Sequence, residues 1–359
     1  QGIYQKKLRN KALKRKKKRG IAMKAVVIKK PGQAVLEQVE IPKPHPGFAL
    51  IKVKASAICA TDLEVLVGNI PAKYPVTPGH EWSGIVTAVG RDEDSHWIGK
   101  RVVGSNDVVC LTCDACRSGN WRYCEEFEEI GFKRNGAYAE YVEVPVYGLC
   151  ELPEQVSFIQ GAFCEPLGVA LGTMEKAGAK FGDTCLIMGS GSIGLCMLAA
   201  AKAMGMKKIV VCASTDKRLK IAKQMGAYAV IPTDSCDLSE EMKKIHPGGT
   251  DVIIDATGIE SCIQQCLKLA RKGGTVALAG YGRGKIMNIR IDDIHIKNLR
   301  VIGTGNNWNQ HKKAVSLMED GTVNIEHFAT ELLSLEEYEK GFALARKRPE
   351  GFVKAVFLL

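Results

Sequence analysis

The sequence contains no hydrophobic run that could form a membrane-spanning helix. Such a helix needs about 20 consecutive apolar residues, and the apolar stretches here are short and interrupted by Gly or Lys. The first 22 residues also lack the apolar core of a secretion signal and the Ser content of a transit peptide. We find no internal repeats. These absences exclude a membrane-spanning protein and a repeat protein.

Acidic residues are missing from the start of the chain. The net charge is +11, but residues 1–22 hold ten of the Lys and Arg residues and no acid, which leaves 40 basic and 39 acidic residues elsewhere. A basic arm of this kind can bind nucleic acid. We favour a disordered extension instead, or sequence translated upstream of a start at Met23, and we expect no nucleic-acid partner.

Thirteen Cys residues are many for a chain without an export signal. Metal ligands and buried thiols are then more common than disulfides, so we expect a reducing compartment, the cytoplasm. The chain has 359 residues, 46% of them apolar and 25% charged, which is the composition of a globular protein. This length is sufficient for two domains.

The hydrophobic pattern divides the chain into two parts. Residues 24–58 and 76–148 contain short strands and turns with little helical period, which predicts a β-rich domain with inserted loops. After about residue 170, short apolar strands alternate with helices, which is typical of a doubly wound parallel sheet. The predicted elements are the strands Thr184–Met188, Ile209–Cys212, Val252–Asp255, Val276–Ala279 and Val353–Leu358, and the helices Ile193–Met204, Lys217–Met225 and 261–271.

Four Cys residues form a compact lobe in the β-rich part. Cys110, Cys113, Cys116 and Cys124 lie within fifteen residues, in the spacing C-x2-C-x2-C-x7-C. Four thiolates at this spacing can close a tetrahedron around one zinc ion. An iron–sulfur cluster is also compatible with the ligand type, whereas unrelated thiols or a disulfide-linked loop fit a reduced chain less well. A closed ligand set leaves no open position, so we predict a structural zinc site.

A glycine-rich turn follows the predicted strand Thr184–Met188. Its sequence, Gly189-Ser190-Gly191-Ser192-Ile193-Gly194, matches G-x-G-x-x-G and opens a predicted helix, the context that this motif requires. The glycines let the backbone approach a dinucleotide pyrophosphate at the helix N-terminus. A tight turn without a ligand is the alternative. The predicted coenzyme-binding residues of this turn are Gly189, Gly191, Ser192, Ile193 and Gly194.

The residue that reads the adenosine ribose stands about 20 residues after the turn, where NAD-binding proteins place Asp or Glu. By spacing, this position is Ala213. The missing carboxylate removes repulsion toward a 2′-phosphate, which Ser214, Lys217 and Arg218 could bind. The sequence therefore favours NADP over NAD. Asp216 is the rival, because a shift in the loop register would bring it to the 2′-hydroxyl of NAD.

Three further fragments are ordinary when each is taken alone. A lone His is more often a core or surface group than a metal ligand, and a lone Cys is usually part of the core. The significance of the fragments lies in their order relative to the lobe and the turn. The fragments are Cys59-Ala60-Thr61-Asp62, Pro78-Gly79-His80-Glu81 and Cys164-Glu165-Pro166-Leu167.

Together these motifs resemble the zinc-containing medium-chain dehydrogenases, in the branch with sorbitol, threonine and glucose dehydrogenases. The resemblance covers residues 24–359. It implies an α/β enzyme with a GroES-like, β-rich catalytic domain and a Rossmann domain with a doubly wound parallel sheet. The motifs that carry it, in order, are Cys59-x-Thr61-Asp62, Gly79-His80-Glu81, the four-Cys lobe, Gly136-Ala137-Tyr138-Ala139-Glu140-Tyr141, Glu165-Pro166-Leu167 and the turn from Gly189 to Gly194.

The resemblance also implies the domain limits and the assembly. We expect a basic extension at 1–22, a catalytic domain with both zinc sites at 23–171 and 309–359, and a Rossmann domain at 172–308, with the active site between the two domains. Relatives that carry the lobe are commonly tetramers built from dimers, whose sheets join at their edges. The strand Leu299–Ile302 could supply such an edge, so we expect a homotetramer, with a homodimer as the alternative.

The family implies a role for each matching position in the catalytic zinc site. Cys59 and His80 match two zinc ligands. Glu81 matches an acidic residue that ligates the metal or lies just behind it. Glu165 matches a fourth position, which ligates directly or holds a zinc-bound water or substrate. Such a site leaves room for an alcohol oxygen, and the metal acts on it as a Lewis acid.

Proton removal and ligand support fall to neighbouring residues. Thr61 matches the hydroxyl that carries the alcohol proton away, and Asp62 is expected to support His80 as a hydrogen-bond acceptor. Two positions depart from the family pattern. Ala60 replaces a Gly, and Glu64 stands where many members carry a relay His. Some glucose dehydrogenases also have a Glu at this position. The proton could therefore leave through Glu64 or bulk water, and a solvated charge is the alternative for this residue.

The expected reaction is reversible hydride transfer between a secondary alcohol and NAD(P), with two zinc ions per chain and a polyol, cyclitol or sugar as substrate. An NADP-linked aldose dehydrogenase is the alternative enzyme, and nucleic-acid binding or scaffolding through residues 1–22 is the alternative from another class. The sequence does not select the substrate, because the pocket depends on loops around Ile70, Trp82, Phe132 and Asn306–Trp308.

Overall fold

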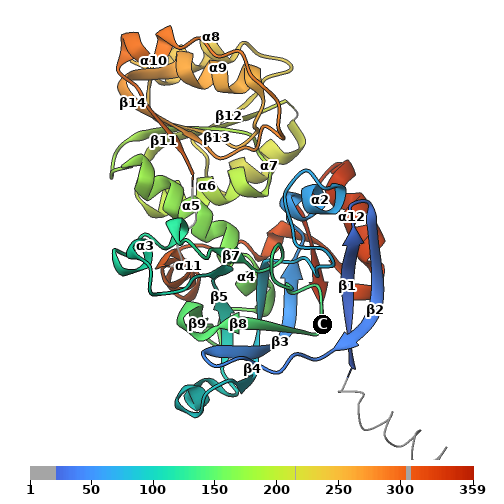
Figure 1. Ribbon diagram of the computed structural model, residues 1–359. Helices are drawn as coiled ribbons and strands as arrows, with labels where there is room; N and C mark the ends of the chain where they lie inside the picture. The colour runs from blue at the N-terminus through green and yellow to red at the C-terminus, as the bar shows by residue number, and fades with distance from the viewer. Residues whose placement is uncertain (1–21, 215, 305–308) are drawn as a thin grey trace, which may run out of the picture.

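The computed structural model describes residues 22–214, 216–304 and 309–359. These residues form two lobes, each built around its own β-sheet, with α5 (Cys164–Ala177) and α6 (Ser192–Ala203) near the junction (Figure 1). The basic segment 1–21 and the loop Asn306–Trp308 lie outside the described residues.

The first lobe contains a seven-stranded sheet that joins the two ends of the described chain. Its strand order is β16-β17-β3-β4-β5-β9, and β8 also pairs with β3. The register pairs Ala57 of β3 with Val356 of β17 on one side and with Glu81 of β4 on the other. The strands are β3 (Phe48–Ala57), β4 (Glu81–Val89), β5 (Arg101–Gly104), β8 (Tyr141–Pro145), β9 (Leu149–Glu151), β16 (Ala329–Leu333) and β17 (Lys354–Leu358).

The side chains of β3 show why this segment forms a strand. Ile51 and Val53 are fully buried in one cluster with Trp82 of β4, whereas Lys52 between them is exposed. This alternation is expected of a strand with one face packed on the core. It confirms the strand that the sequence predicts at this position.

Two two-stranded sheets and five α-helices complete the described part of the first lobe. None of the helices in the described residues is long and apolar enough to cross a membrane. The helix α12 packs against β17 and α2. The strands of these sheets are β1 (Ala22–Lys30), β2 (Gln33–Glu40), β6 (Asp107–Val108) and β7 (Glu128–Glu129), and the helices are α2 (Ala60–Val67), α3 (Asp114–Arg117), α4 (Phe158–Ala162), α11 (Asn309–Glu319) and α12 (Tyr338–Lys347).

The second lobe contains a six-stranded sheet in which every pairing is parallel. Its order, β12-β11-β10-β13-β14-β15, is that of the doubly wound Rossmann fold. The predicted fold class is confirmed. The elements are β10 (Thr184–Met188), β11 (Lys207–Ala213), β12 (Ala229–Pro232), β13 (Thr250–Asp255), β14 (Ala270–Leu278), β15 (Arg300–Gly303), α7 (Asp216–Gln224), α8 (Leu238–Ile245), α9 (Glu260–Leu269) and α10 (Asp292–Lys297).

The central strands of this sheet are buried on both faces. Ile187 and Leu186 are neighbours in β10 and neither is exposed, yet they belong to different core clusters. Successive side chains of a strand point to opposite faces, so Ile187 packs toward α5 and α6 and Leu186 toward α8 and α9. This explains why these strands are apolar runs in the sequence without alternation.

The helix α5 connects the two lobes in sequence and in space. It packs against α6 of the second lobe and against α11 of the returning C-terminal segment, and it ends at Gly178, whose φ of +69° closes the helix. The domain limit expected between residues 171 and 172 falls inside α5. The limit between residues 308 and 309 adjoins residues outside the described part, so the domain limits stay predictions.

Candidate active site

The first element of the site is the junction between β3 and α2. β3 ends at Ala57 and α2 begins at Ala60, with Cys59 as its N-cap. Asp62, in the first turn, accepts a hydrogen bond from the Cys59 backbone N–H at 2.9 Å. Thr61 Oγ1 lies 3.3 Å from Cys59 Sγ. The helix start therefore fixes both the thiol and the hydroxyl beside it.

The second element is the loop that precedes β4. Gly79 has a φ of +100°, and a Cβ built at this residue would lie 2.5 Å from the ring of Tyr138. Only Gly fits this turn, which carries the chain into His80 and Glu81. Because β3 and β4 pair with Ala57 opposite Glu81, the turn brings His80 beside Cys59.

Three of the predicted metal ligands come together at this point. One ligand atom from each of Cys59, His80 and Glu81 can be chosen so that all three lie within 4.8 Å of one another. His80 and Glu81 are buried and Cys59 is half-buried. A thiolate, an imidazole and a carboxylate form the donor set that zinc prefers, so the residues fit a zinc ion.

Asp62 connects the two elements. Its Oδ1 lies 3.2 Å from His80 Nδ1 and accepts the Gly79 N–H at 3.3 Å, and its Oδ2 accepts the Tyr138 hydroxyl at 2.5 Å. With Nδ1 facing Asp62, Nε2 of His80 is the nitrogen that remains for a metal. Burial disfavours the imidazolium, but Asp62 and Cys59 outweigh it and raise the pKa of His80 well above its ordinary value.

Glu81 has a buried cationic partner that the sequence analysis missed. Lys354, the first residue of β17, places Nζ 2.5 Å from the Glu81 carboxylate, and their side chains are 3% and 1% exposed. Burial lowers the pKa of Lys354, but Glu81 outweighs it and the net shift is upward. The signal in the sequence was a single Lys in an otherwise apolar terminal strand.

Glu165 lies near this group but outside it. It occupies the first turn of α5 and is not among the residues whose ligand atoms lie within 4.8 Å. Burial raises the pKa of Glu165 to about 7, Glu81 adds to the rise, and His80 and Lys354 oppose it. The structure therefore groups Cys59 and His80 with Glu81, and it places Glu165 close enough to interact with their charges.

Glu64 contacts the other lobe. Its carboxylate accepts a hydrogen bond from Asn69 Nδ2 at 2.7 Å and lies 3.4 Å from Nε of Arg283, in the loop after β14. Thr61 and Glu64 are three residues apart in α2 and so share one face of the helix. The ion pair with Arg283 ties this helix to the Rossmann lobe, a contact that the sequence did not reveal.

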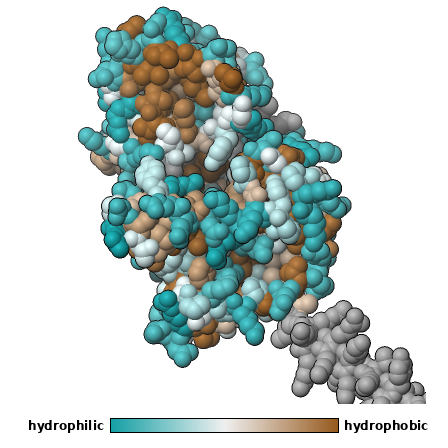
Figure 2. Space-filling model, viewed as in Figure 1, coloured by the Kyte–Doolittle hydropathy of each residue, from teal (hydrophilic) through white to brown (hydrophobic). Residues whose placement is uncertain are grey.

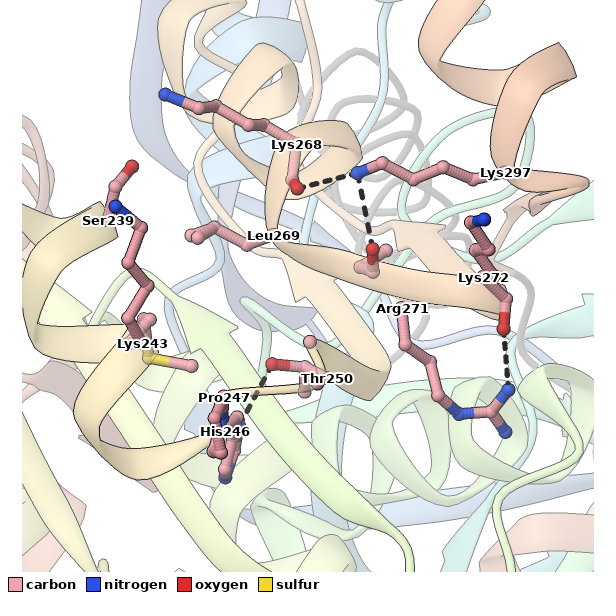
Figure 3. Close-up of a pocket in the computed structure, with 14 residues that line it drawn as sticks. Ser239, Lys243, His246, Pro247, Thr250, Lys268, Leu269, Arg271, Lys272 and Lys297 are labelled. Atoms are coloured by element: carbon pink, nitrogen blue, oxygen red, sulfur yellow. Dashed lines mark hydrogen bonds between the residues drawn. The ribbon is translucent and has the colours of Figure 1, made fainter.

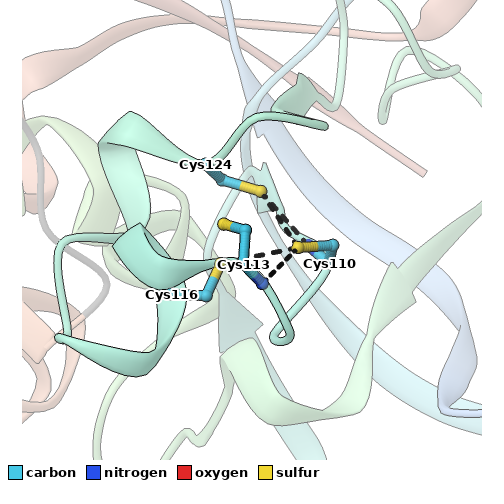
Figure 4. A group of neighbouring side chains, drawn as sticks. All are labelled: Cys110, Cys113, Cys116 and Cys124. Atoms are coloured by element: carbon cyan, nitrogen blue, oxygen red, sulfur yellow. Dashed lines mark hydrogen bonds between the residues drawn. The ribbon is translucent and has the colours of Figure 1, made fainter.

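The four Cys residues of the lobe lie close together in the structure. Cys110 Sγ lies 3.9 Å from Cys116 Sγ and 3.6 Å from Cys124 Sγ, and all four thiols point toward one centre (Figure 4). Hydrogen bonds from Thr112 and Cys113 lower the pKa of Cys110 to about 6. The set has the composition and closeness of a closed zinc site.

The glycine-rich turn lies at the carboxyl end of β10, where doubly wound sheets bind their ligands. Gly189 has a φ of +105°, and a Cβ at Gly194 would lie 1.9 Å from Gly189 O, so the turn is tight. A Cβ at Gly191 would meet nothing within 4 Å. The Ser190 hydroxyl is buried and has no hydrogen-bond partner among the described residues. The open space and this hydroxyl at the N-terminus of α6 fit a dinucleotide pyrophosphate.

The residue predicted to read the ribose is Ala213. Ala213 is the last residue of β11, and the next residue, Ser214, is exposed. Arg218 is half-buried in α7, and burial and the nearby Arg348 lower its pKa. The side chains of Asp216 and Lys217 lie outside the described part of the structure.

The cavity in Figure 3 lies at the amino ends of strands of the parallel sheet, opposite the end that carries the glycine-rich turn. It measures about 310 Å³, and its lining includes Thr250 and Ala270, the first residues of β13 and β14. Lys297 Nζ, which lines it, already donates to Lys268 O at 2.6 Å and to Ala270 O at 3.2 Å. We assign this cavity no part in the active site, because the glycine-rich turn predicted to bind the coenzyme follows the carboxyl end of β10.

Comparison with known families identifies both lobes. Residues 45–154 match the model of the alcohol dehydrogenase GroES-like domain, and residues 192–320 match the model of zinc-binding dehydrogenases. The chain is 34% identical to L-threonine 3-dehydrogenase of Pyrococcus horikoshii over 94% of this chain and 99% of that protein. It is 30% identical to sorbitol dehydrogenase of Bacillus subtilis over 88% and 91%.

Solved structures give the same result. A zinc-binding dehydrogenase from Sinorhizobium meliloti bound to NADP superposes with a TM-score of 0.86 at 33% identity, over 94% of this chain and 99% of that one. An alcohol dehydrogenase from Escherichia coli complexed with NADH superposes with a TM-score of 0.89 at 27% identity, over 95% and 100%. The chain belongs to the zinc-containing medium-chain dehydrogenase/reductase family and is an enzyme of its alcohol and polyol dehydrogenase type.

For two of the three glycines of the turn, we expect different effects of the same substitution. Gly194→Ala is expected to destabilise the protein by roughly 1–3 kcal/mol, because its Cβ would overlap the turn backbone. Gly191→Ala is expected to leave the melting temperature unchanged and to weaken coenzyme binding severalfold, because its Cβ enters the pyrophosphate space. Thermal unfolding and fluorescence titration with NADPH and NADH measure both effects. Unchanged coenzyme affinity in Gly191→Ala would contradict this placement of the pyrophosphate.

Proposed function

We propose that the protein catalyses reversible hydride transfer between a secondary alcohol and NAD(P), with a polyol, cyclitol or sugar as its substrate and NADP as its preferred coenzyme. The observation that supports this proposal most strongly is the group of Cys59, His80 and Glu81, whose ligand atoms lie within 4.8 Å of one another. The coenzyme turn from Gly189 to Gly194 supplies the second reactant, and Glu64 connects the two lobes beside the ligand group.

We assign the catalytic zinc to Cys59 and His80, with Glu81 or Glu165 as the acidic ligand. A bound zinc ion would act as a Lewis acid that makes the alcohol proton easier to remove. Lys354 neutralises Glu81 in the buried pair, which favours Glu165 as the carboxylate that faces substrate. The four Cys residues of the lobe would hold the second, structural zinc ion.

The proton path is assigned to α2. The Thr61 hydroxyl would accept the alcohol proton while donating its own proton outward, because it lies beside Cys59 at the inner end of the helix. Glu64, one turn further along the same face, would receive the proton directly or through water. Its contacts with Asn69 and Arg283 hold the carboxylate in place. The hydride would pass from the alcohol carbon to the nicotinamide ring, so charge and atoms balance.

The substrate class rests on the relatives. Sorbitol dehydrogenase and L-threonine 3-dehydrogenase are named for substrates that carry secondary hydroxyl groups, and both match over nearly the whole chain. The alternative, an NADP-linked aldose dehydrogenase, is favoured by Glu64 and by Ala213. A panel of polyols, cyclitols and aldoses assayed with NAD and NADP separates the two. Nucleic-acid binding through residues 1–22 would show as salt-sensitive RNA binding that is lost when this segment is deleted.

The ligand assignment predicts the metal content. Elemental analysis of the purified protein is expected to give two zinc ions per chain. Cys59→Ser and His80→Ala are expected to abolish turnover and to hold only one zinc ion, because each removes a ligand from the catalytic group. Both variants should still bind coenzyme, since the turn lies in the other lobe. Substantial activity in a Cys59→Ser protein that contains one zinc ion would refute the catalytic assignment.

The matched control is a substitution in the lobe. Cys116→Ser removes a buried thiol from the other metal group, so it is expected to lose the structural zinc. If Cys59→Ser and Cys116→Ser lose the same metal ion, the division into two sites is wrong.

The assembly that we propose is a homotetramer built from dimers that join at β15. In the described residues β15 pairs only with β14, so one side of this strand is open. Near it in the sequence, Ile286, Ile291 and Ile296 are 97%, 71% and 68% exposed. A hydrophobic patch lies on the face of this lobe that Figure 2 shows. An open strand edge with apolar neighbours is a common dimer interface.

Light scattering on a size-exclusion column tests this assembly. We expect the mass of a tetramer, with a dimer as the smaller alternative. Val301→Lys, which places a charge on the exposed side of β15, is expected to shift the protein toward smaller species. A monomer whose mass does not change with concentration would rule out both assemblies.

The coenzyme preference follows from one position. A carboxylate at residue 213 would accept the ribose hydroxyls of NAD and repel a 2′-phosphate, and Ala213 does neither. Ser214 and Arg218 could bind the phosphate by charge-assisted hydrogen bonds, each worth about 1.5–3 kcal/mol. One such bond corresponds to a preference of about tenfold or more.

We therefore expect kcat/KM with NADP to exceed that with NAD about tenfold, and we expect Ala213→Asp to reverse this order. Steady-state kinetics with both coenzymes provide the measurement. Ala213→Ser is the control, since it adds a polar group without charge. If the parent prefers NAD and Ala213→Asp changes nothing, the loop register is wrong and Asp216 is the residue that reads the ribose.

A further inference from the structure

Tyr138 carries a buried hydroxyl that the proposed reaction does not use. Its side chain is fully buried, and its hydroxyl lies 2.5 Å from Asp62 Oδ2 and 3.2 Å from Ala57 O. A phenol has one hydrogen to donate. The shorter contact is to a charged acceptor, so Asp62 receives this hydrogen. The bond joins residues 76 positions apart in the sequence.

The carboxylate that Tyr138 contacts holds both segments that carry the proposed ligands. Oδ2 of Asp62 accepts the backbone N–H of Cys59, whereas Oδ1 accepts the N–H of Gly79 and faces Nδ1 of His80. The orientation of this one carboxylate therefore sets the direction of the His80 ring and the position of the Cys59 backbone together.

The hydroxyl of Tyr138 gives this carboxylate its third hydrogen bond, beside those from the N–H groups of Cys59 and Gly79. An ionised carboxylate offers about four lone-pair positions, and here each oxygen of Asp62 has two donors or close nitrogen neighbours. A buried charge is costly unless it is fully hydrogen-bonded. Without the phenol, Oδ2 would keep only the Cys59 N–H, and the carboxylate would be free to rotate toward other donors.

Tyr138 itself is fixed from three directions, so it can act as a rigid support. Its ring lies against Gly79, and it meets the ring of Phe357 edge-on with a centroid distance of 5.1 Å. Its backbone N–H donates to Pro78 O at 3.0 Å. The residue is therefore bound to the same loop that carries His80, through its backbone and through its ring.

We propose that Tyr138 is a positioning residue for the catalytic metal group, which acts by fixing the Asp62 carboxylate and, through it, His80 and Cys59. The inference rests on the proposed function, because it takes Cys59 and His80 as the ligands of the catalytic zinc. It adds a residue to which that function assigns no role. The hydroxyl, not the ring, is the group that performs this task.

Tyr138→Phe removes the hydroxyl and keeps the ring. Loss of a residue that orients a metal ligand typically weakens metal binding 10–100-fold, and we expect about tenfold weaker binding of the catalytic zinc here. The full-length protein is equilibrated with a zinc chelator of known affinity, and retained zinc is measured by elemental analysis. The lobe zinc would be held by a separate group of four Cys residues that does not include Asp62 or His80, so we expect it to stay. Turnover should fall in kcat, with the coenzyme KM unchanged.

Tyr141→Phe is the matched control. It makes the same substitution three residues further along the chain, at a half-buried tyrosine for which the described contacts include no hydroxyl hydrogen bond. We expect zinc retention and kcat equal to those of the parent. A second comparison uses Cys59→Ser, which is expected to hold only the lobe zinc. Adding Tyr138→Phe to this variant should cause no further loss of zinc, because the catalytic zinc is already absent.

The results separate the inference from the function on which it rests. Tyr138→Phe protein that keeps both zinc ions with parental affinity overturns the inference. Equal loss of both zinc ions also overturns it, because the hydroxyl would then stabilise the domain as a whole. A parent protein that holds only the lobe zinc overturns the proposed function, and the inference with it. Selective loss of one zinc ion in Tyr138→Phe, absent in Tyr141→Phe, supports both.

Discussion

The arrangement of the proposed catalytic site depends on one buried carboxylate. Asp62 is 1% exposed. Burying an ionised carboxylate costs much free energy unless its oxygens accept hydrogen bonds. The hydrogen-bond donors to Asp62 come from the Cys59 backbone, the loop before β4 and the hydroxyl of Tyr138. The hydrogen bonds that stabilise the Asp62 carboxylate therefore also hold the proposed zinc ligands Cys59 and His80 together. Burial opposes the ionised form, but His80 and these hydrogen bonds keep the pKa of Asp62 below its ordinary value.

A second buried charge links the two ends of the chain. Lys354 belongs to the last strand and pairs with Glu81, the first residue of β4, because β17 and β4 both flank β3. Removing one member of such a buried pair typically costs about 3–5 kcal/mol, since the other charge is left unpaired. The C-terminal segment thus completes the site as well as the sheet. Arg283 of the Rossmann lobe also contributes a charge near the site, through an ion pair with Glu64. This pair is half-exposed and therefore weaker.

The sequence was most informative where all members of a site are close together in the chain. The four-Cys lobe and the turn from Gly189 to Gly194 each lie within fifteen residues, so spacing alone constrains their geometry. The parallel strands were predicted for a similar reason, because a strand buried on both faces must be an apolar run. The position of Ala213 at the end of β11 also followed from local spacing.

The sequence did not predict these contacts between distant segments. Tyr138 and Asp62 are 76 residues apart, and Lys354 and Glu81 are 273 apart; only the pairing of β17, β3 and β4 brings them together. Likewise, the sequence identified Glu81 and Glu165 as equal candidates for the zinc ligand, and tertiary structure placed only Glu81 within the group. The sequence by itself determined which residues we propose to carry the chemistry, because local motifs fix residue type and spacing. The tertiary structure decided which of them are joined through a buried charged side chain such as Asp62 or Glu81, because these contacts depend on strand register and burial.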